Sequence, residues 1–242
     1  MAPFGASRAG LMSVRRDAIP DSEADQKLAH RWYLGDNGPF VDQVATNDAT
    51  NNGTVSVSGD WVDGSAREAD GDSEWVNLTD WDGWWGDSTS DWAIALSLKT
   101  NQDQSSTWLG SRDSENRNIL NMRSESGVVE VLIRDETGNI FERSFDVNYA
   151  DDSPRRFVIN KTSNSGNGIR LWENGSEISG TTDRDQGFTD PANTFPEAVG
   201  LFCENEGGVG ANDFFAGVID DVCVFEDSLS ESEIESYLRP WE

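Results

Sequence analysis

Aromatic and acidic side chains alternate in one glycine-punctuated stretch of the chain, Trp81-Asp82-Gly83-Trp84-Trp85-Gly86-Asp87. Indole rings can stack on sugar rings, and neighbouring carboxylates can accept hydrogen bonds from sugar hydroxyls. The candidate carbohydrate-binding residues are therefore Trp81, Trp84, Trp85, Asp82 and Asp87. Tryptophan is also enriched in protein interfaces, so the same rings could instead cover one end of a core or line a subunit contact.

Residues for nucleophilic or metal-assisted catalysis are scarce. His30 is the only histidine, so Ser-His-Asp, Cys-His and histidine-based zinc sites are not expected. Cys203 and Cys223 are the only cysteines, and we expect them on two late strands of one sheet. Two cysteines do not make a disulfide framework, and free buried thiols are the simpler expectation, although pairing stays open. We expect no catalytic residues.

Short runs of β-branched and aromatic residues, separated by turn residues, recur along the chain and are typical of a β-sandwich. They predict strands at 28–34, 54–57, 74–78, 92–98, 106–110, 128–134, 140–147, 155–161, 169–173, 176–178 and 214–225. Asn174-Gly175 between two of the runs suits a two-residue type I′ hairpin turn. The expected class is all-β, in one domain.

The last predicted strand, 214–225, carries apolar residues on both of its faces, which predicts a central strand that is buried on both sides. A short helix should follow it. Ser230 and Glu233 have the spacing of a capping box, and Leu229 and Ile234 stand where a hydrophobic staple would clamp the first turn.

This C-terminal pattern, Gly-x-Ile-Asp-Asp-Val-x-Val-Phe followed by Leu-Ser-x-x-Glu-Ile, resembles the end of the laminin-G-like, concanavalin-like jelly-roll domains. Residues 28–34, and 64–76 further on, look like earlier strands of that family, so the resemblance covers roughly 28 to 238. It implies a jelly-roll sandwich of two antiparallel sheets with a short C-terminal helix. Glucanases on this fold need two carboxylates across the glycosidic bond, carried as Glu-x-Asp-x-x-Glu. No such run occurs here, so an enzyme is not expected.

The resemblance also implies a structural Ca²⁺ between the first acidic loop and the final strand. The matching positions are Asp36 or Asp42 in the loop and Asp220 or Asp221 in the strand. Calcium takes oxygen ligands from carboxylates and carbonyls, and a buried carboxylate is costly unless it is paired or metal-bound. Hydrogen-bonded or solvated aspartates are the alternative.

The chain is strongly acidic, with 45 Asp and Glu against 18 Lys and Arg and a formal net charge of −27. Self-repulsion of this size opposes compaction unless salt screens it, and the Debye length falls to about 3 Å at 1 M salt. The composition is typical of a halophilic protein, an ordinary acidic protein being the alternative. It disfavours binding to nucleic acid or to an anionic membrane. No run is apolar enough for membrane insertion, and 1–25 lack the apolar core of a secretory signal.

Residues 1–25 are rich in small residues and predict an N-terminal arm before a domain at 26–242. Phe4, Arg8, Leu11 and Met12 could anchor the arm on another protein, or the arm could be a disordered tail. This opening resembles the beginnings of structural proteins from tailed viruses of halophilic archaea.

Together, the resemblances imply a virion surface protein, in a capsid turret, a decoration or a tail, that is made in the host cytoplasm and works in high salt. The arm would bind other virion proteins, and a lectin-like domain would bind a host glycan or surface glycoprotein. One alternative is an architectural virion component without a ligand, and a homo-oligomer is expected. Another alternative is a cellular carbohydrate-binding or adhesion module.

Overall fold

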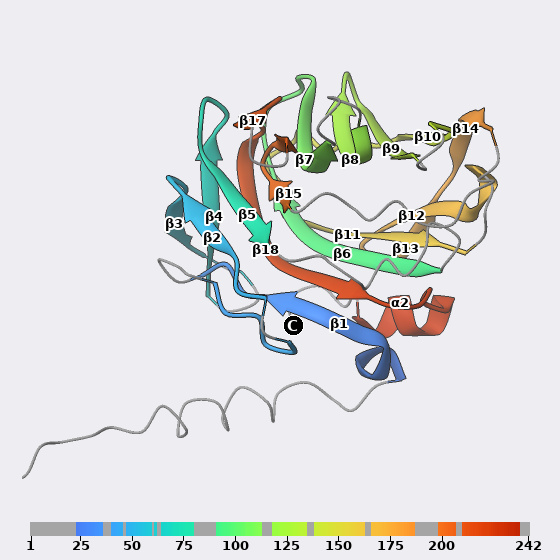
Figure 1. Ribbon diagram of the computed structural model, residues 1–242, viewed down its shortest axis with the longest axis horizontal. Coiled ribbons are helices and arrows are strands. Elements are labelled where there is room, and N and C mark those ends of the chain that lie inside the picture. The colour runs from blue at the N-terminus through green and yellow to red at the C-terminus, as the bar shows by residue number, and fades with distance from the viewer. Residues whose placement is uncertain are drawn as a thin grey trace, which may run out of the picture.

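The computed structural model describes residues 23–35, 40–45, 47–59, 61, 64–79, 91–112, 118–134, 138–162, 166–186, 198–206 and 210–237. Within these ranges the chain is built almost entirely from strands, arranged as two sheets that pack face to face (Figure 1). The predicted all-β jelly-roll sandwich of two antiparallel sheets is therefore confirmed.

The eight-stranded sheet has β18 near its middle, with β1 (Leu28–Trp32) pairing with part of β18. Its order is β13 (Ser176–Ile178), β12 (Ile169–Glu173), β11 (Arg155–Lys161), β6 (Trp92–Lys99), β18 (Ala216–Phe225), β4 (Ser65–Asp70) and β3 (Val55–Ser58).

The ten-stranded sheet covers the other side of the core. Its order is β14 (Gly180–Asp185), β10 (Ile140–Asp146), β9 (Val128–Arg134), β8 (Asn118–Glu125), β7 (Ser106–Arg112), β15 (Ala198–Leu201), β5 (Trp75–Thr79) and β2 (Thr50–Asn52). The short strands β16 (Glu204–Glu206) and β17 (Gly210–Asn212) join it, and β16 runs parallel to β7.

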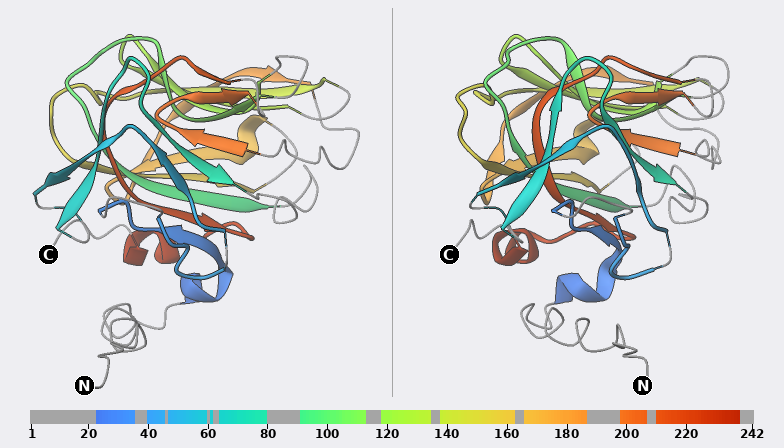
Figure 2. Two further views of the ribbon diagram at one scale, coloured as in Figure 1. Left: turned by 60° about the vertical axis from the view of Figure 1, so that its left-hand side comes forward. Right: turned by 90° about the vertical axis from the view of Figure 1, so that its left-hand side faces the viewer.

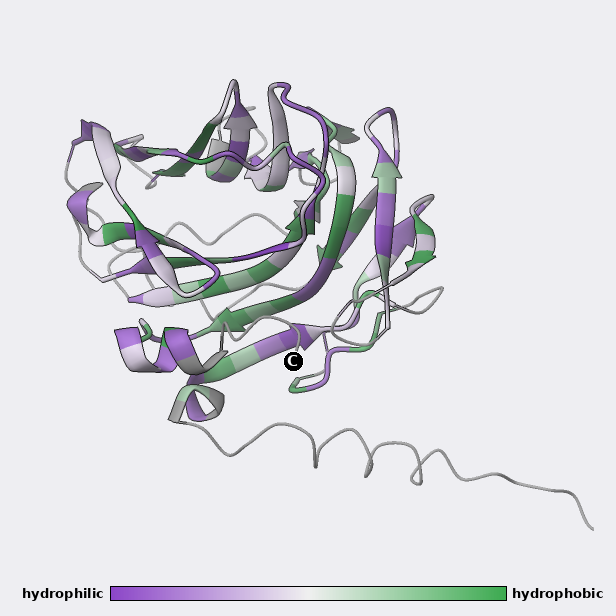
Figure 3. Ribbon diagram, turned by 180° about the vertical axis from the view of Figure 1, so that it is seen from behind, coloured by the Kyte–Doolittle hydropathy of each residue, from purple (hydrophilic) through white to green (hydrophobic). Residues whose placement is uncertain are grey.

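The core between the sheets is rich in aromatic rings. Trp108 is fully buried, and its ring centre lies 5.1 Å from that of Phe157, 5.5 Å from that of Tyr149 and 6.1 Å from that of Phe215. Figure 3 shows apolar residues concentrated on the long strands that line this core. Rings of this size remove large apolar areas from water and so dominate the stability of the sandwich.

A second apolar cluster lies on the outer face of the eight-stranded sheet. It includes Cys223, Phe225, Leu229 and Ile234. The 3₁₀ helix η1 (Glu23–Lys27) and the helix α2 (Glu231–Tyr237) lie together over this face (Figure 2). The prediction that the last strand is buried on both sides is therefore confirmed.

Helix α2 begins as the sequence predicts. The Ser230 N–H donates to Glu233 Oε2 at 2.6 Å, and the Glu233 N–H donates to Ser230 Oγ at 3.4 Å, which closes the capping box. The hairpin between β12 and β13 is also as expected, since Asn174 and Gly175 have φ of 47° and 83°, the signs that a type I′ turn requires.

The placement of the two cysteines on one sheet is wrong. Cys203 lies between β15 and β16 of the ten-stranded sheet, whereas Cys223 lies in β18 of the other sheet. The chain changes sheets between β17 and β18, and alternation within each strand gives no sign of that crossing. Both thiols are free and fully buried. No helix in the described ranges is long and apolar enough to cross a membrane.

Candidate functional site

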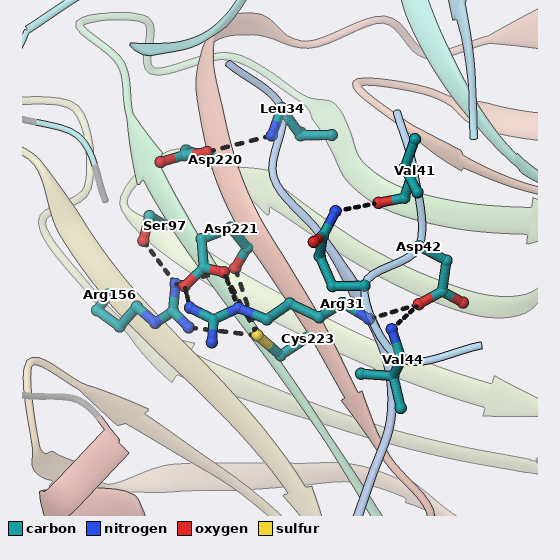
Figure 4. Close-up of polar contacts among 11 residues, drawn as sticks. Arg31, Leu34, Val41, Asp42, Val44, Ser97, Arg156, Asp220, Asp221 and Cys223 are labelled. Atoms are coloured by element: carbon teal, nitrogen blue, oxygen red, sulfur yellow. Dashed lines mark hydrogen bonds and ion pairs between the residues drawn. The ribbon is translucent and has the colours of Figure 1, made fainter. Parts of the chain in front are cut away.

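A buried polar network joins β1 to the middle of β18, at the two adjacent aspartates (Figure 4). The register of β18 against β6 shifts between Asp220 and Cys223, and Asp221 has a φ of 45°. Such a bulge breaks the strict alternation of side chains. It allows two consecutive carboxylates to find separate partners inside one strand.

Asp221 lies between two arginines. Arg31 Nε donates to Asp221 Oδ1 at 2.7 Å, and Arg156 Nη1 lies 2.8 Å from Asp221 Oδ2. Arg156 also donates to Ser97 Oγ at 2.8 Å. Burial alone would raise the pKa of Asp221, but the positive charges of Arg156 and Arg31 outweigh it and hold that pKa below its usual range.

Asp220 has a different environment from its neighbour. Its side chain is fully buried, and Oδ1 accepts a hydrogen bond from the Leu34 N–H at 3.4 Å. Burial, followed by the negative charge of Asp221, raises the pKa of Asp220 to about 7. Two adjacent carboxyl groups in one strand therefore differ in protonation near neutral pH.

Asp42 is held in the segment that follows β1. His30 Nδ1 and Asp42 Oδ2 share a hydrogen bond of 2.6 Å, and the N–H groups of Arg31 and Val44 donate to Asp42 Oδ1 at 3.2 and 3.0 Å. Burial would raise the pKa of Asp42, but these hydrogen bonds lower it overall. His30 itself lies in β1 and is buried.

Two of the predicted calcium ligands, Asp42 and Asp221, contact the same residue, since Arg31 donates to Asp42 through its backbone N–H and to Asp221 through its guanidinium. Asp42 and Asp221 are hydrogen-bonded, as in the alternative interpretation of hydrogen-bonded or solvated aspartates, and Asp221 is in addition ion-paired with arginine. Asp36 lies outside the described residues. In the described ranges no group of three or more His, Cys, Asp or Glu side chains is arranged to hold a metal ion. The Ca²⁺ site stays a prediction from the sequence.

A second buried polar cluster lies on the ten-stranded sheet and was not predicted. Glu204 is fully buried, accepts a hydrogen bond from Asn121 Nδ2 at 2.8 Å and lies 2.5 Å from Arg112 Nη2. Burial raises the pKa of Glu204 to about 7, although Arg112 opposes the shift. Two glycines on neighbouring strands, Gly110 and Gly200, lie against residues 203–205: a Cβ at Gly200 would lie 2.4 Å from Cys203 Sγ, and one at Gly110 would lie 3.3 Å from Glu204 Cα.

The predicted sugar-binding residues Trp81, Trp84, Trp85, Asp82 and Asp87 lie outside the described residues, as do the predicted anchoring residues Phe4, Arg8, Leu11 and Met12. The strands on either side of the tryptophan segment are described. β5 belongs to the ten-stranded sheet and β6 to the eight-stranded sheet, so residues 80–90 connect the two sheets. Thr79 at the end of β5 pairs with Ala198 at the start of β15.

Comparison with known proteins identifies structures with a similar fold. No protein-family model and no curated protein sequence matches the chain. Among solved structures, the binding domain of Paraclostridial Mosquitocidal Protein 1 is 12% identical with a TM-score of 0.65, and covers 89% of this chain and 52% of its own. The binding domain of botulinum neurotoxin DC, in complex with rat synaptotagmin II, is 10% identical with a TM-score of 0.65, over 91% of this chain and 53% of its own.

The botulinum neurotoxin serotype D ligand-binding domain, in complex with N-acetylneuraminic acid, is 14% identical with a TM-score of 0.59, over 89% of this chain and 51% of its own. The chain thus spans about half the length of the structures that it matches. Identity this low shows the fold and not the activity. The chain therefore has the jelly-roll β-sandwich fold that is found in these toxin binding domains.

Proposed function

We propose that this chain is a lectin-like binding module that recognises a glycan or glycoprotein on a host cell surface. The observation that carries the proposal is the match of about nine-tenths of the chain to binding domains, of which one is in complex with N-acetylneuraminic acid and another with synaptotagmin II. Fold alone does not fix function, so the binding chemistry must come from this chain's own residues.

The segment between β5 and β6 supplies that chemistry. Its candidate sugar-binding residues are three tryptophans and two of its four aspartates, Trp81, Trp84, Trp85, Asp82 and Asp87. Segments that connect elements of a rigid scaffold often carry binding residues. Indole faces would stack on a sugar ring, while the aspartates would accept hydrogen bonds from its hydroxyl groups.

The setting in which this module works is a further part of the proposal. The net charge of −27 suits molar salt, and the opening of the chain resembles virion proteins of halophilic archaeal viruses. We therefore place the module on a virion surface, attached to other virion proteins through residues 1–25 and facing the host cell.

A glycan array probed with the full chain in 2–3 M salt, roughly the range where charge is screened over about 3 Å or less, tests the binding function. We expect retention on a subset of glycans and, for a Trp84→Ala/Trp85→Ala variant, an affinity at least about tenfold weaker, equivalent to about 1.4 kcal/mol. Trp61→Ala is the matched control, since Trp61 is a partly exposed indole elsewhere in the chain.

The unfolding temperature of the tryptophan variant separates the two interpretations of the segment. An unchanged unfolding temperature with lost binding supports a sugar platform. A large fall in unfolding temperature means that the rings pack on the core or on a subunit. If the full chain binds no glycan on the array, a glycan-binding function is contradicted and an architectural role gains support.

A further inference from the structure

Each side of the sandwich is bordered by two terminal strands, one from each sheet. On one side the terminal strands are β13 and β14, which Ser179 joins; on the other they are β2 and β3, which Gly53 and Thr54 join. A terminal strand carries backbone N–H and C=O groups that no neighbour satisfies, so proteins protect such strands with charge, proline, bulges or a covering segment. The protection of each side can therefore be compared directly.

The side formed by β13 and β14 is protected by charge. In β13, Glu177 Oε1 accepts a hydrogen bond of 2.8 Å from Arg170 Nε. The exposed part of β14 ends in Asp183, Arg184 and Asp185. A further strand approaching this edge would meet several charged side chains, which disfavours pairing.

Within the described residues, strand β3 carries no charged side chain, no proline and no bulge, and Ser56 Oγ donates to the Gly35 carbonyl at 2.9 Å. It reads Val-Ser-Val-Ser, Val55 is 56% exposed, and both serines are exposed. It lies within residues 49–59, the longest stretch without a charged residue in a chain of net charge −27. Its neighbour β2 is covered at its start, where Phe40 and Ala49 exchange backbone hydrogen bonds of 2.9 and 2.8 Å. Within the described part of the chain, β4 alone pairs with β3.

We propose that β3 is a self-association edge, which pairs antiparallel with β3 of a second copy about a two-fold axis through Ser56. In this register Val55 stands opposite Val57 of the partner subunit. Residues directly opposite in an antiparallel pair share a face, so valine meets valine and serine meets serine. The sequence of the strand is thus complementary to itself, as a two-fold interface requires.

The charge of the chain also favours a second copy over a foreign strand. Most surfaces of this protein repel one another, and β3 is an edge where two copies can approach without opposing carboxylates. Molar salt reduces the remaining repulsion, because charges more than about 3 Å apart are then largely screened. The interface joins the two eight-stranded sheets into one, and a dimer displays two binding sites, which would strengthen attachment to a multivalent surface.

Disulfide trapping tests the proposed register. In Ser56→Cys the two introduced thiols would face each other across the axis, with Cα atoms about 4.5–5.5 Å apart, within disulfide range. The native Cys203 and Cys223 are fully buried and should stay unreactive. We expect a covalent dimer of the full chain under mild oxidation in molar salt. Ser176→Cys, an exposed serine on β13, is the matched control and should stay monomeric.

Light scattering over a dilution series gives an independent measurement. We expect the full chain in molar salt to shift with concentration from the monomer mass of 26.6 kDa towards twice that value. Val55→Lys/Val57→Lys should stay monomeric with an unchanged unfolding temperature. Val41→Lys/Val44→Lys, at valines that are 45% and 48% exposed, should still dimerise.

Three results would overturn the proposal. The first is a monomer at every concentration without cross-linking of Ser56→Cys. The second is equal cross-linking of Ser56→Cys and Ser176→Cys. The third is a dimer that persists in the Val55→Lys/Val57→Lys variant. None of these results depends on glycan binding, so failure here is distinguishable from failure of the proposed function.

Discussion

At the scale of single residues, the structure gives the adjacent aspartates of β18 separate physical roles. Asp221 is a charge partner for Arg31 and Arg156, while Asp220 is a buried carboxyl whose pKa is raised to about 7. Their difference arises from the positions of the two arginines relative to the strand.

Removing the charge of Asp221 should be strongly destabilising. Asp221→Asn would leave Arg31 and Arg156, both buried, facing a neutral amide. Breaking a buried pair in this way typically costs about 3–5 kcal/mol, because a charge is left uncompensated. Denaturant unfolding in molar salt measures the loss. Asp227→Asn, at an exposed aspartate, should change stability by less than about 0.5 kcal/mol, and an equal effect of both substitutions would refute this role.

Asp220 predicts a dependence of stability on pH. Its pKa is raised from 3.8 to about 7 on folding, so the folded state binds the proton more tightly than the unfolded state. Its contribution to stability is therefore full below about pH 4 and is lost as pH rises towards 7, with a slope on the order of 1 kcal/mol per pH unit. Unfolding free energies between pH 4 and 8 measure this slope.

Asp220→Asn should make that slope shallower by about one proton. Glu204, whose pKa is also raised to about 7, should account for a similar dependence that remains in the variant. Identical slopes for the variant and the natural chain would contradict the assignment to Asp220.

The residue-scale contacts could be predicted only in part. Two aspartates inside a β-branched strand indicate that partners must exist, because buried carboxylates are costly. The identity of those partners depends on β1 pairing with β18 and on Arg156 of β11 reaching Asp221 across β6, and Arg31 and Arg156 are 190 and 65 residues away from Asp221. No local pattern encodes a contact at that separation.

At the scale of elements, β18 and α2 were predictable because their signals are local: alternation, a capping box and a staple. β2, β8 and β14 to β17 were not predicted. β15 to β17 have three or four residues each, and β16 depends on glycines in two other strands. The sequence shows the two glycines, but it does not show which segment of the chain packs against them.

The close contact between Gly200 and Cys203, just before β16, gives a prediction for Gly200. A Cβ added there would lie 2.4 Å from Cys203 Sγ, so Gly200→Ala should destabilise the fold by about 1–3 kcal/mol through overpacking. Cys203→Ala removes the colliding atom. In a double-mutant cycle, the combined variant should lose less stability than the sum of the two single variants. Strict additivity would show that the close contact is absent.

The cap of α2 gives a second prediction at this scale. Ser230→Ala removes the hydroxyl that accepts the Glu233 N–H, and loss of such a cap typically costs about 1 kcal/mol. Thermal unfolding monitored by circular dichroism measures the change. Glu235→Ala, at an exposed position in the same helix, should have little effect. A comparable loss in both variants would show that the effect belongs to the helix surface and not to the cap.

At the scale of the whole molecule, the strand pattern predicts the fold, whereas the composition predicts how stability depends on salt. The alternation of the strands and the C-terminal pattern predict the jelly roll, and the structural comparisons confirm it. The ligand cannot be predicted from either source, because one sandwich supports many binding surfaces.

The net charge of −27 predicts that the folded chain needs salt. We expect the free energy of unfolding to rise steadily between about 0.1 and 2 M NaCl, while the Debye length falls from about 10 Å to below 3 Å and self-repulsion is screened. Urea unfolding at several salt concentrations measures this rise, since urea adds no charge of its own. A stability that is independent of salt would contradict a halophilic surface.

The measurement that tests the central claim most directly is the binding of the fluorescently labelled chain to halophilic archaeal cells in molar salt, before and after periodate oxidation of the cell-surface sugars. A glycan-binding module predicts saturable binding to untreated cells, its loss after periodate treatment, and weak binding of the Trp84→Ala/Trp85→Ala variant to either sample. Absence of saturable binding, or binding that periodate leaves unchanged, would contradict the account.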